Sequence, residues 1–204
     1  MHPITRSLRY GVALLAGAIA LYALRYLAPG VQAPPVIQAN AYRAPWLVIH
    51  AAAGAVALLF GTIQFWTRLR ARFPKAHRHL GRIYVAACMV GGVAGLVLAA
   101  GASTGSASTI GFGALALAWI GSTGLAWRRA LQGRFAAHRA WMVRSFALTL
   151  SAVTLRLYLP LAFVLPYPFA TTYGAIAFLC WIPNLLFAEL WLRRDRRLFA
   201  SSER

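Results

Sequence analysis

The sequence predicts an all-α, polytopic transmembrane helical bundle with six spans, for two reasons. The chain of 204 residues is 60% hydrophobic and only 12% charged, with a mean hydropathy of +0.63, which is far more apolar than a soluble domain. Apolar stretches also recur six times, each near the ~20 residues with which a helix crosses a bilayer core. These stretches cover residues 10–27, 46–66, 83–100, 111–127, 141–165 and 170–192.

The first stretch follows a basic segment that contains Arg6 and Arg9, which is the layout of a signal peptide as well as of a permanent helix. No convincing A-x-A-like cleavage site precedes the Pro-rich "APPV", so we favour an uncleaved first helix within residues 1–30. A five-helix core over residues 46–192 and a basic tail over residues 193–204 complete the expected organisation.

The links between the stretches alternate in charge. "RLRARFPKAHRHLGR" after the second stretch and "WRRALQGRFAAHR" after the fourth are rich in arginine, whereas "GASTGSAST" and "PYP" contain no basic residue. Only Arg43 clearly falls on the other side. Because Lys and Arg near span ends are retained in the cytoplasm, both termini are expected to be cytoplasmic. We expect a multi-pass protein of the bacterial plasma (inner) membrane.

The formal net charge of +18 raises the question of a nucleic-acid partner. The arginines flank apolar spans and do not cluster on a soluble face with interleaved aromatic residues, which argues against nucleic acid. The expected partners are the lipid bilayer and its anionic headgroups, because each Lys or Arg near an anionic surface contributes roughly 1 kcal/mol of attraction.

The two basic links resemble each other, since "RFPKAHR" and "RFAAHR" both precede an apolar stretch. This similarity predicts two related helical hairpins, built from stretches two and three and from stretches four and five. It places His77 and His138 at equivalent depths.

The second stretch carries small and polar residues on one helical face, which allows another helix or a flat ligand to approach closely. The residues of this face are His50, Gly54, Ala57, Gly61 and Gln64. In the sixth stretch, Pro183 predicts a kink, and Asn184 beside it predicts a hydrogen bond to another helix.

The fifth stretch has a polar seam within ~60° of one helical face, calculated at 100° per residue. The seam consists of His138, Trp141, Ser145, Thr149, Ala152 and Arg156. Arg144 lies off the seam near the cytoplasmic interface, and we expect Glu189, the only acidic residue within a span, to contact Arg144 or His138. Arg156 lies inside the predicted boundary, where it either snorkels to backbone carbonyls or forms an anion or polar-ligand site.

Four segments taken in order, "HAAAGAVALLFGTIQF", "HRHLGRIYV", "AHRAWMVRSFALTLSAVTLRLYLP" and "WIPNLLFAE", resemble a family of predicted bacterial membrane proteins known only as a domain of unknown function. The resemblance covers about residues 46–190 and implies no established activity. The family's recurring positions are His50, Gln64, His77, Arg78, Gly81, Arg82, Tyr84, His138, Arg139, Trp141, Arg156, Asn184 and Glu189.

The layout is also loosely similar to that of two-haem b-type cytochrome bundles, which implies a first functional hypothesis: binding of haem b with membrane electron transfer to a redox partner. His77 and His138 are then the candidate iron ligands, and neighbouring arginines such as Arg139 neutralise the propionates. The full set of candidate cofactor-binding residues is His50, His77, His138, Arg139, Arg156 and Asn184.

Other functions remain open. His50, Arg156 and Asn184 are expected to line a polar cavity if the protein is a small-molecule or lipid transporter or a binding module. The sequence shows neither paired intramembrane carboxylates nor obvious broken helices in both halves, which weakens the transporter hypothesis. A structural or assembly role is a further alternative. No H-E-x-x-H pattern or carboxylate–histidine arrangement supports a hydrolase, so whether the protein is an enzyme stays undecided.

Overall fold

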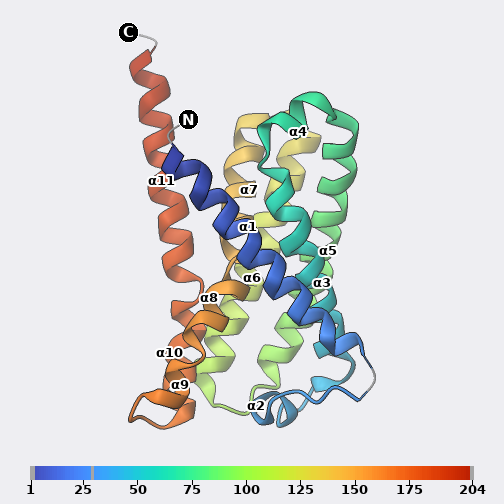
Figure 1. Ribbon diagram of the computed structural model, residues 1–204, viewed down its shortest axis with the longest axis vertical. Coiled ribbons are helices and arrows are strands. Elements are labelled where there is room, and N and C mark those ends of the chain that lie inside the picture. Colours follow the sequence, from blue (N-terminus) through green and yellow to red (C-terminus); the bar gives the residue numbers. More distant parts are fainter. Residues whose placement is uncertain (1–2, 29, 203–204) are drawn as a thin grey trace.

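A computed structural model describes residues 3–28 and 30–202, and describes side chains at residues 10–28, 30–66 and 69–194. Within these residues every regular element is a helix, which confirms the predicted all-α class (Figure 1). The helices are α1 (Pro3–Leu24), the 3₁₀-helix η1 (Arg25–Leu27), α2 (Pro35–Gln38), α3 (Arg43–Gln64), α4 (Thr67–Arg72), α5 (Pro74–Ala100), α6 (Ser106–Leu131), α7 (Phe135–Thr149), α8 (Ser151–Tyr158), α9 (Leu161–Val164), α10 (Phe169–Leu179) and α11 (Ile182–Ser202).

Six segments among the described residues are long and apolar enough to span a membrane, as the sequence predicted. They are Tyr10–Leu27, Arg43–Gln64, Pro74–Ala100, Ser106–Leu131, Phe135–Val164 and Phe169–Arg194. The third and fifth spans begin earlier than the apolar stretches, because the basic links continue the helices outward: α5 begins at Pro74, a residue suited to the first helical turn. His77 and His138 therefore both lie on helices.

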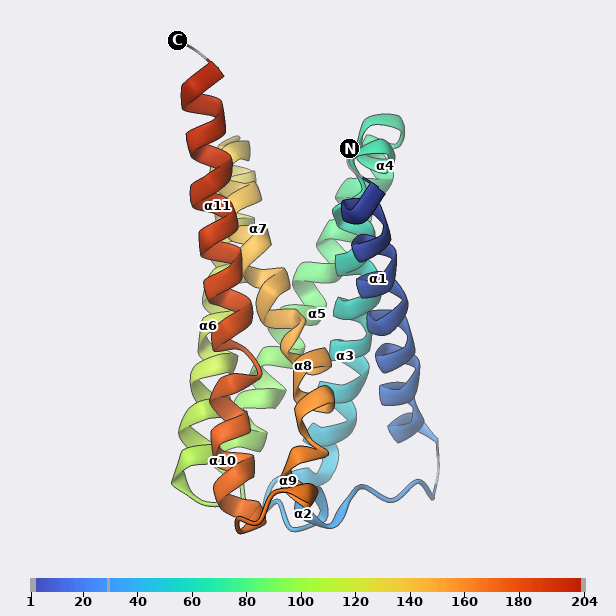
Figure 2. The same cartoon turned by 60° about the vertical axis from the view of Figure 1, so that its left-hand side comes forward.

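The chain crosses the bundle six times, so both of its ends lie at the same end of the molecule (Figure 2). This end, which we call the basic end, also holds α4 and the link between α6 and α7. The opposite, distal end holds η1, α2, α9 and the link between α5 and α6 (Figures 1 and 2). The predicted basic tail continues α11 as a helix to Ser202, and Glu203 lies outside the described residues.

The first helix crosses its neighbours obliquely and packs on them through small side chains (Figure 1). Buried Ala16 and Ala20 of α1 share a cluster with Ala55 and Leu58 of α3 and with Val153 of α8. Alanine lets two helix backbones come close, so the oblique α1 can contact α3 and α8 together.

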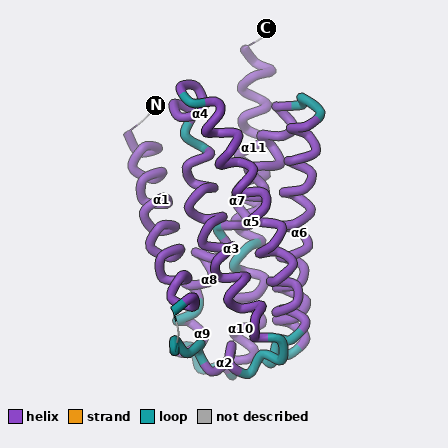
Figure 3. Tube along the Cα trace, turned by 90° about the vertical axis from the view of Figure 1, so that its right-hand side faces the viewer, coloured by secondary structure: helices purple, strands orange, loops and turns teal. Residues whose placement is uncertain are grey.

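The fifth and sixth spans are both interrupted near their middle. Helix α7 ends at Thr149 and α8 begins at Ser151, while α10 ends at Leu179 and α11 begins at Ile182. Figure 3 shows loops at the two ends of the bundle and at these interruptions. The second interruption confirms the kink predicted from Pro183. The first was not predicted: Leu150 takes a 3₁₀-like turn, in which the Val153 amide donates to the Leu150 carbonyl at 2.9 Å.

An ion pair ties the fifth span to the sixth near the basic end. Arg144 Nε lies 2.5 Å from Glu189 Oε1, and Arg144 Nη2 lies 3.0 Å from Glu189 Oε2, which is a bidentate arrangement. The two side chains are only 18% and 33% exposed. The Arg144 guanidinium also lies 4.6 Å from the centre of the Trp141 ring. The predicted Glu189–Arg144 contact is therefore confirmed.

We expect Arg144→Gln and Glu189→Gln each to lower the free energy of unfolding by about 1–3 kcal/mol, because each breaks a partly buried bidentate ion pair. Thermal unfolding in detergent measures the effect. Arg128→Gln, which removes an exposed arginine of the same end, serves as the matched control. The double reversal Arg144→Glu with Glu189→Arg should recover part of the loss. Single variants no less stable than Arg128→Gln would contradict a stabilising role for the pair.

Candidate binding cavity

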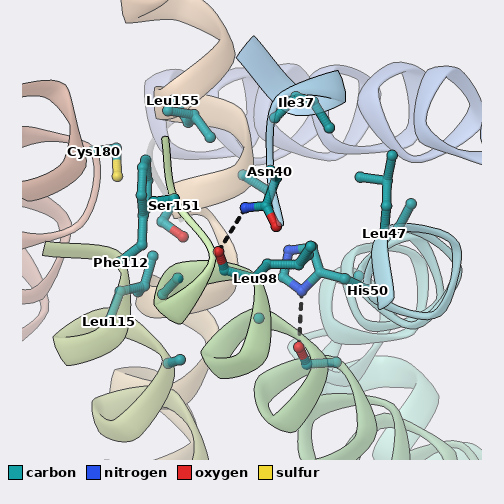
Figure 4. A pocket seen from close by; sticks show the side chains of 18 of the residues that line it. Ile37, Asn40, Leu47, His50, Leu98, Phe112, Leu115, Ser151, Leu155 and Cys180 are labelled. Carbon is teal, nitrogen blue, oxygen red and sulfur yellow. Dashed lines mark hydrogen bonds between the residues drawn. The ribbon is translucent and has the colours of Figure 1, made fainter. Parts of the chain in front are cut away.

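A cavity of about 250 Å³ lies inside the distal half of the bundle, between α3, α5, α6, α8 and α10 (Figure 4). Residues of α2 and of the link between α5 and α6 also border it. Most of its lining is apolar, including Leu47, Leu98, Phe112, Leu115 and Leu155. An apolar cavity with a few polar groups is the usual form of a small-molecule site.

His50 of α3 supplies one polar group of this cavity. Its Nδ1 lies 2.8 Å from the Gly91 carbonyl oxygen (Figure 4). A carbonyl only accepts hydrogen bonds, so Nδ1 carries the proton, and Nε2 of the neutral ring has a free lone pair. A side chain at Gly95 would place its Cβ 3.0 Å from the imidazole, so glycine is what leaves room for the ring.

Arg156 of α8 supplies the positive charge. Its Nη1 donates to the Ala152 carbonyl at 2.7 Å, and the described residues offer its other guanidinium donors no hydrogen-bond acceptor. The backbone contact is the one expected of a snorkelling arginine. Arg156 also borders the cavity. Glu189 is the one acidic residue whose side chain the structure describes, and it pairs with Arg144. Within the described part, Arg156 therefore has no acidic partner.

A network of buried hydroxyl groups lies beside the cavity. The Tyr84 hydroxyl is 2.8 Å from Ser145 Oγ and 2.9 Å from Thr149 Oγ1, and Trp119 Nε1 donates to Thr149 Oγ1 at 2.9 Å. Thr123 Oγ1 lies 2.6 Å from Ser145 Oγ. Ser145 and Thr149 of the polar seam thus form hydrogen bonds with side chains of α5 and α6. Helical periodicity indicated the seam but could not identify Trp119 or Thr123, because both lie in an otherwise apolar stretch.

Asn184 does not border this cavity. Its Nδ2 lies within 3.2–3.3 Å of the Ala147 carbonyl, the Thr154 hydroxyl and the Cys180 carbonyl, and Thr154 Oγ1 itself donates to the Cys180 carbonyl. The expected interhelical hydrogen bond is present. Asn184 and Thr154 thus hold together the two interruptions of spans five and six, a role that differs from the expected place in the cavity wall.

The other predicted site residues lie towards the basic end. His77 and His138 are close enough for their charges to repel each other, and His138 Nδ1 donates to the Ala126 carbonyl at 2.9 Å. The guanidinium of Arg139 lies 5.2 Å from the centre of the Trp191 ring. Along α5, His77 precedes Gly91, the partner of His50, by fourteen residues, or roughly 21 Å. The six candidate cofactor-binding residues therefore do not form one site. His50 and Arg156 border the cavity, whereas the other four lie elsewhere.

The structure also adds residues that the sequence analysis missed at the distal end. Arg25 and Tyr26 of η1 lie there, and Tyr26 borders the cavity. The charge pattern had identified only Arg43 as basic on that side. The periodicity of an isolated first helix contains no information about which other helix its last turn will meet, so the contact could not be predicted.

The fold and cavity define a polytopic α-helical membrane protein. Residues 47–192 match the family described as "Predicted membrane protein (DUF2306)", whose function is unknown, and the chain belongs to this family. This confirms the family resemblance. No curated protein and no solved structure matches the chain. The matched region includes His50 and Arg156 but not α1 or η1.

We expect Asn184→Ala to lower the free energy of unfolding by about 1–3 kcal/mol, because it removes hydrogen bonds to acceptors at both helix interruptions. Thermal unfolding measures the loss, with Gln132→Ala, which removes an exposed side-chain amide, as control. Thr154→Ala combined with Asn184→Ala should cost less than the sum of the single changes, because either change alone already removes the hydrogen bond between the two side chains. Additive losses would show that the two side chains act separately.

Proposed function

We propose that this protein binds, and carries within the membrane, a small lipid-soluble molecule that has an anionic head group. The head group contacts Arg156 and His50, and the apolar body lies against the aliphatic and aromatic lining. One observation carries the proposal: Arg156 borders an apolar cavity with donors left over and no acidic partner among the described residues.

The unpaired charge supports a ligand because an arginine stays protonated at every physiological pH and is costly to hold away from water. A bound anion provides the missing counter-charge and accepts hydrogen bonds from the planar guanidinium. The free Nε2 of His50 can accept a hydrogen bond from a hydroxyl or an acidic proton of the same ligand. A ligand without an apolar body would gain little from the lining.

The interrupted helices support movement of the ligand. Thr149 and Ser151, which flank the turn at Leu150, border the cavity, and so does Cys180 at the second interruption. Transporters often bind substrate beside discontinuous helices, where the backbone can change direction. The arginine bias supports a cytoplasmic basic end in a bacterial plasma membrane, which would place the cavity in the outer half of the bilayer.

Decanoate and decyl phosphate should bind the detergent-purified protein and raise its unfolding temperature, whereas decanol should do so much less. Arg156→Gln should weaken binding of the anionic probes about 10- to 100-fold, because a charged hydrogen bond contributes about 1.5–3 kcal/mol. Without ligand this variant should unfold at the wild-type temperature. Arg43→Gln, an exposed arginine of the distal end, is the matched control. Binding that is unchanged by Arg156→Gln, or equal for decanol, would refute the proposal.

Haem b is a second candidate ligand, favoured by the histidines of the basic end. The Nδ1 hydrogen bond of His138 to a carbonyl leaves Nε2 free, which is the usual arrangement of an iron-ligating histidine. His77 lies close to it on α5. A haem there would supply one-electron chemistry for a membrane redox partner. Neither histidine borders the cavity, so this candidate is separate from the proposed anionic site.

A dithionite-reduced minus oxidised spectrum tests the second candidate. If haem is bound, the wild-type protein should show a sharp α-band that both His77→Ala and His138→Ala abolish. His79→Ala, which removes an exposed histidine of the same link, should keep the band. Absence of the band from protein produced with ample haem would rule this candidate out.

A further inference from the structure

We propose that the head group of the ligand is a phosphate monoester, held jointly by Arg156 of α8 and by Arg25 of η1. The inference rests on the proposed function, because it identifies the chemical class of the anion in the same cavity. It adds Arg25, a residue outside the family-matched region, to the proposed head-group contacts of Arg156 and His50.

The aromatic side chains of α1 and η1 hold Arg25 beside Tyr26, a residue that borders the cavity. Its guanidinium carbon lies 3.9 Å from the centre of the Tyr22 ring and 4.8 Å from that of Tyr26. Its Nη2 donates to the Tyr26 hydroxyl at 3.0 Å. Tyr26 itself borders the cavity together with Arg156. Tyr26 therefore connects the second guanidinium to the site.

The two arginines are close enough for their charges to repel each other, and Arg156 also interacts electrostatically with Tyr22 and Tyr26. Neither arginine has an ion pair among the described residues. Arg25 Nε is buried and has no hydrogen-bond partner. Two neighbouring guanidiniums repel each other unless an anion lies between them, and the repulsion grows as their surroundings become less polar. The face of the Tyr22 ring offsets part of this cost for Arg25.

The charge and geometry of the pair favour phosphate over carboxylate. A carboxylate has one charge and two coplanar oxygens, which a single bidentate arginine satisfies. A phosphate monoester has a charge of about −1.5 to −2 at pH 7 and three acceptor oxygens, so it can accept hydrogen bonds from two guanidiniums at once. The phosphodiester of an ordinary membrane phospholipid has one charge and a blocked oxygen. It therefore matches the pair less well than a terminal phosphate.

The monoester can belong to a lipid-soluble molecule or to free phosphate, and the binding experiment distinguishes these sources. Affinities of decyl phosphate, decanoate and inorganic phosphate are measured by titration calorimetry on the full chain in neutral detergent. We expect decyl phosphate to bind at least about tenfold more tightly than either of the other two probes. Equal binding of inorganic phosphate would overturn the lipid-soluble ligand while leaving the phosphate head group in place.

The role of Arg25 is tested by its variants. Arg25→Gln should weaken decyl phosphate binding about tenfold and leave decanoate binding within about twofold of wild type. Arg25→Lys keeps the charge but not the planar guanidinium. Its affinity for decyl phosphate should lie between those of Arg25→Gln and the wild-type protein. Arg43→Gln should bind all three probes as wild type. The unliganded unfolding temperature and the gel-filtration profile show that each variant is folded.

The outcomes separate this inference from the proposed function. If decanoate and decyl phosphate bind equally and Arg25→Gln weakens neither, the phosphate assignment is wrong while the anionic site at Arg156 stands. If no anionic amphiphile binds the wild-type protein, the proposed function fails together with the assignment.

Discussion

In a hydrocarbon core, water cannot satisfy a backbone N–H or C=O group, so every interruption of a spanning helix must be satisfied by the protein itself. This constraint explains the arrangement of spans five and six. The carbonyl of Cys180 accepts from Thr154 and lies within hydrogen-bond distance of Asn184 Nδ2. Because two short polar side chains serve both interruptions, the two spans must bend at the same depth. That shared bend lies beside the cavity, where Cys180 and Ser151 form part of the lining.

The scarcity of acidic residues limits which basic residues can form an ion pair within the protein. The chain contains three acidic residues against 21 basic ones. Glu189 pairs with Arg144 near the basic end, where it links α7 to α11. Arg156 and Arg25, at the distal end, are beyond its reach. The protein thus has an internal ion pair at one end, while Arg25 and Arg156 at the other end contact tyrosine rings and a backbone carbonyl.

The predictable part of the structure is the part that depends on local patterns. Hydropathy and length are properties of continuous segments, and they identified all six spans. Depth in the bilayer also follows from position along a span, which is why Arg144 and Glu189 could be paired in advance. The bend at Leu150 could not be predicted, because Leu150 itself is an ordinary helix former in an apolar run. Asn184 was recognised as a polar residue near a kink, but its three partners come from two different spans.

In the candidate site, too, local patterns identified some residues, while contacts between distant helices could not be predicted. His50 and Arg156 were recognised as polar residues in apolar spans, and the structure shows that they border one cavity. The contribution of α1 depends on its oblique crossing, which alanine packing against α3 and α8 determines. Arg25 and Tyr26 belong to a segment outside residues 47–192, so the family core alone contains one of the two cations. A family core without such a segment would retain Arg156, and under the proposal it would match a singly charged head group better than a doubly charged one. In the proposed site, η1 is therefore the element that supplies the second positive charge.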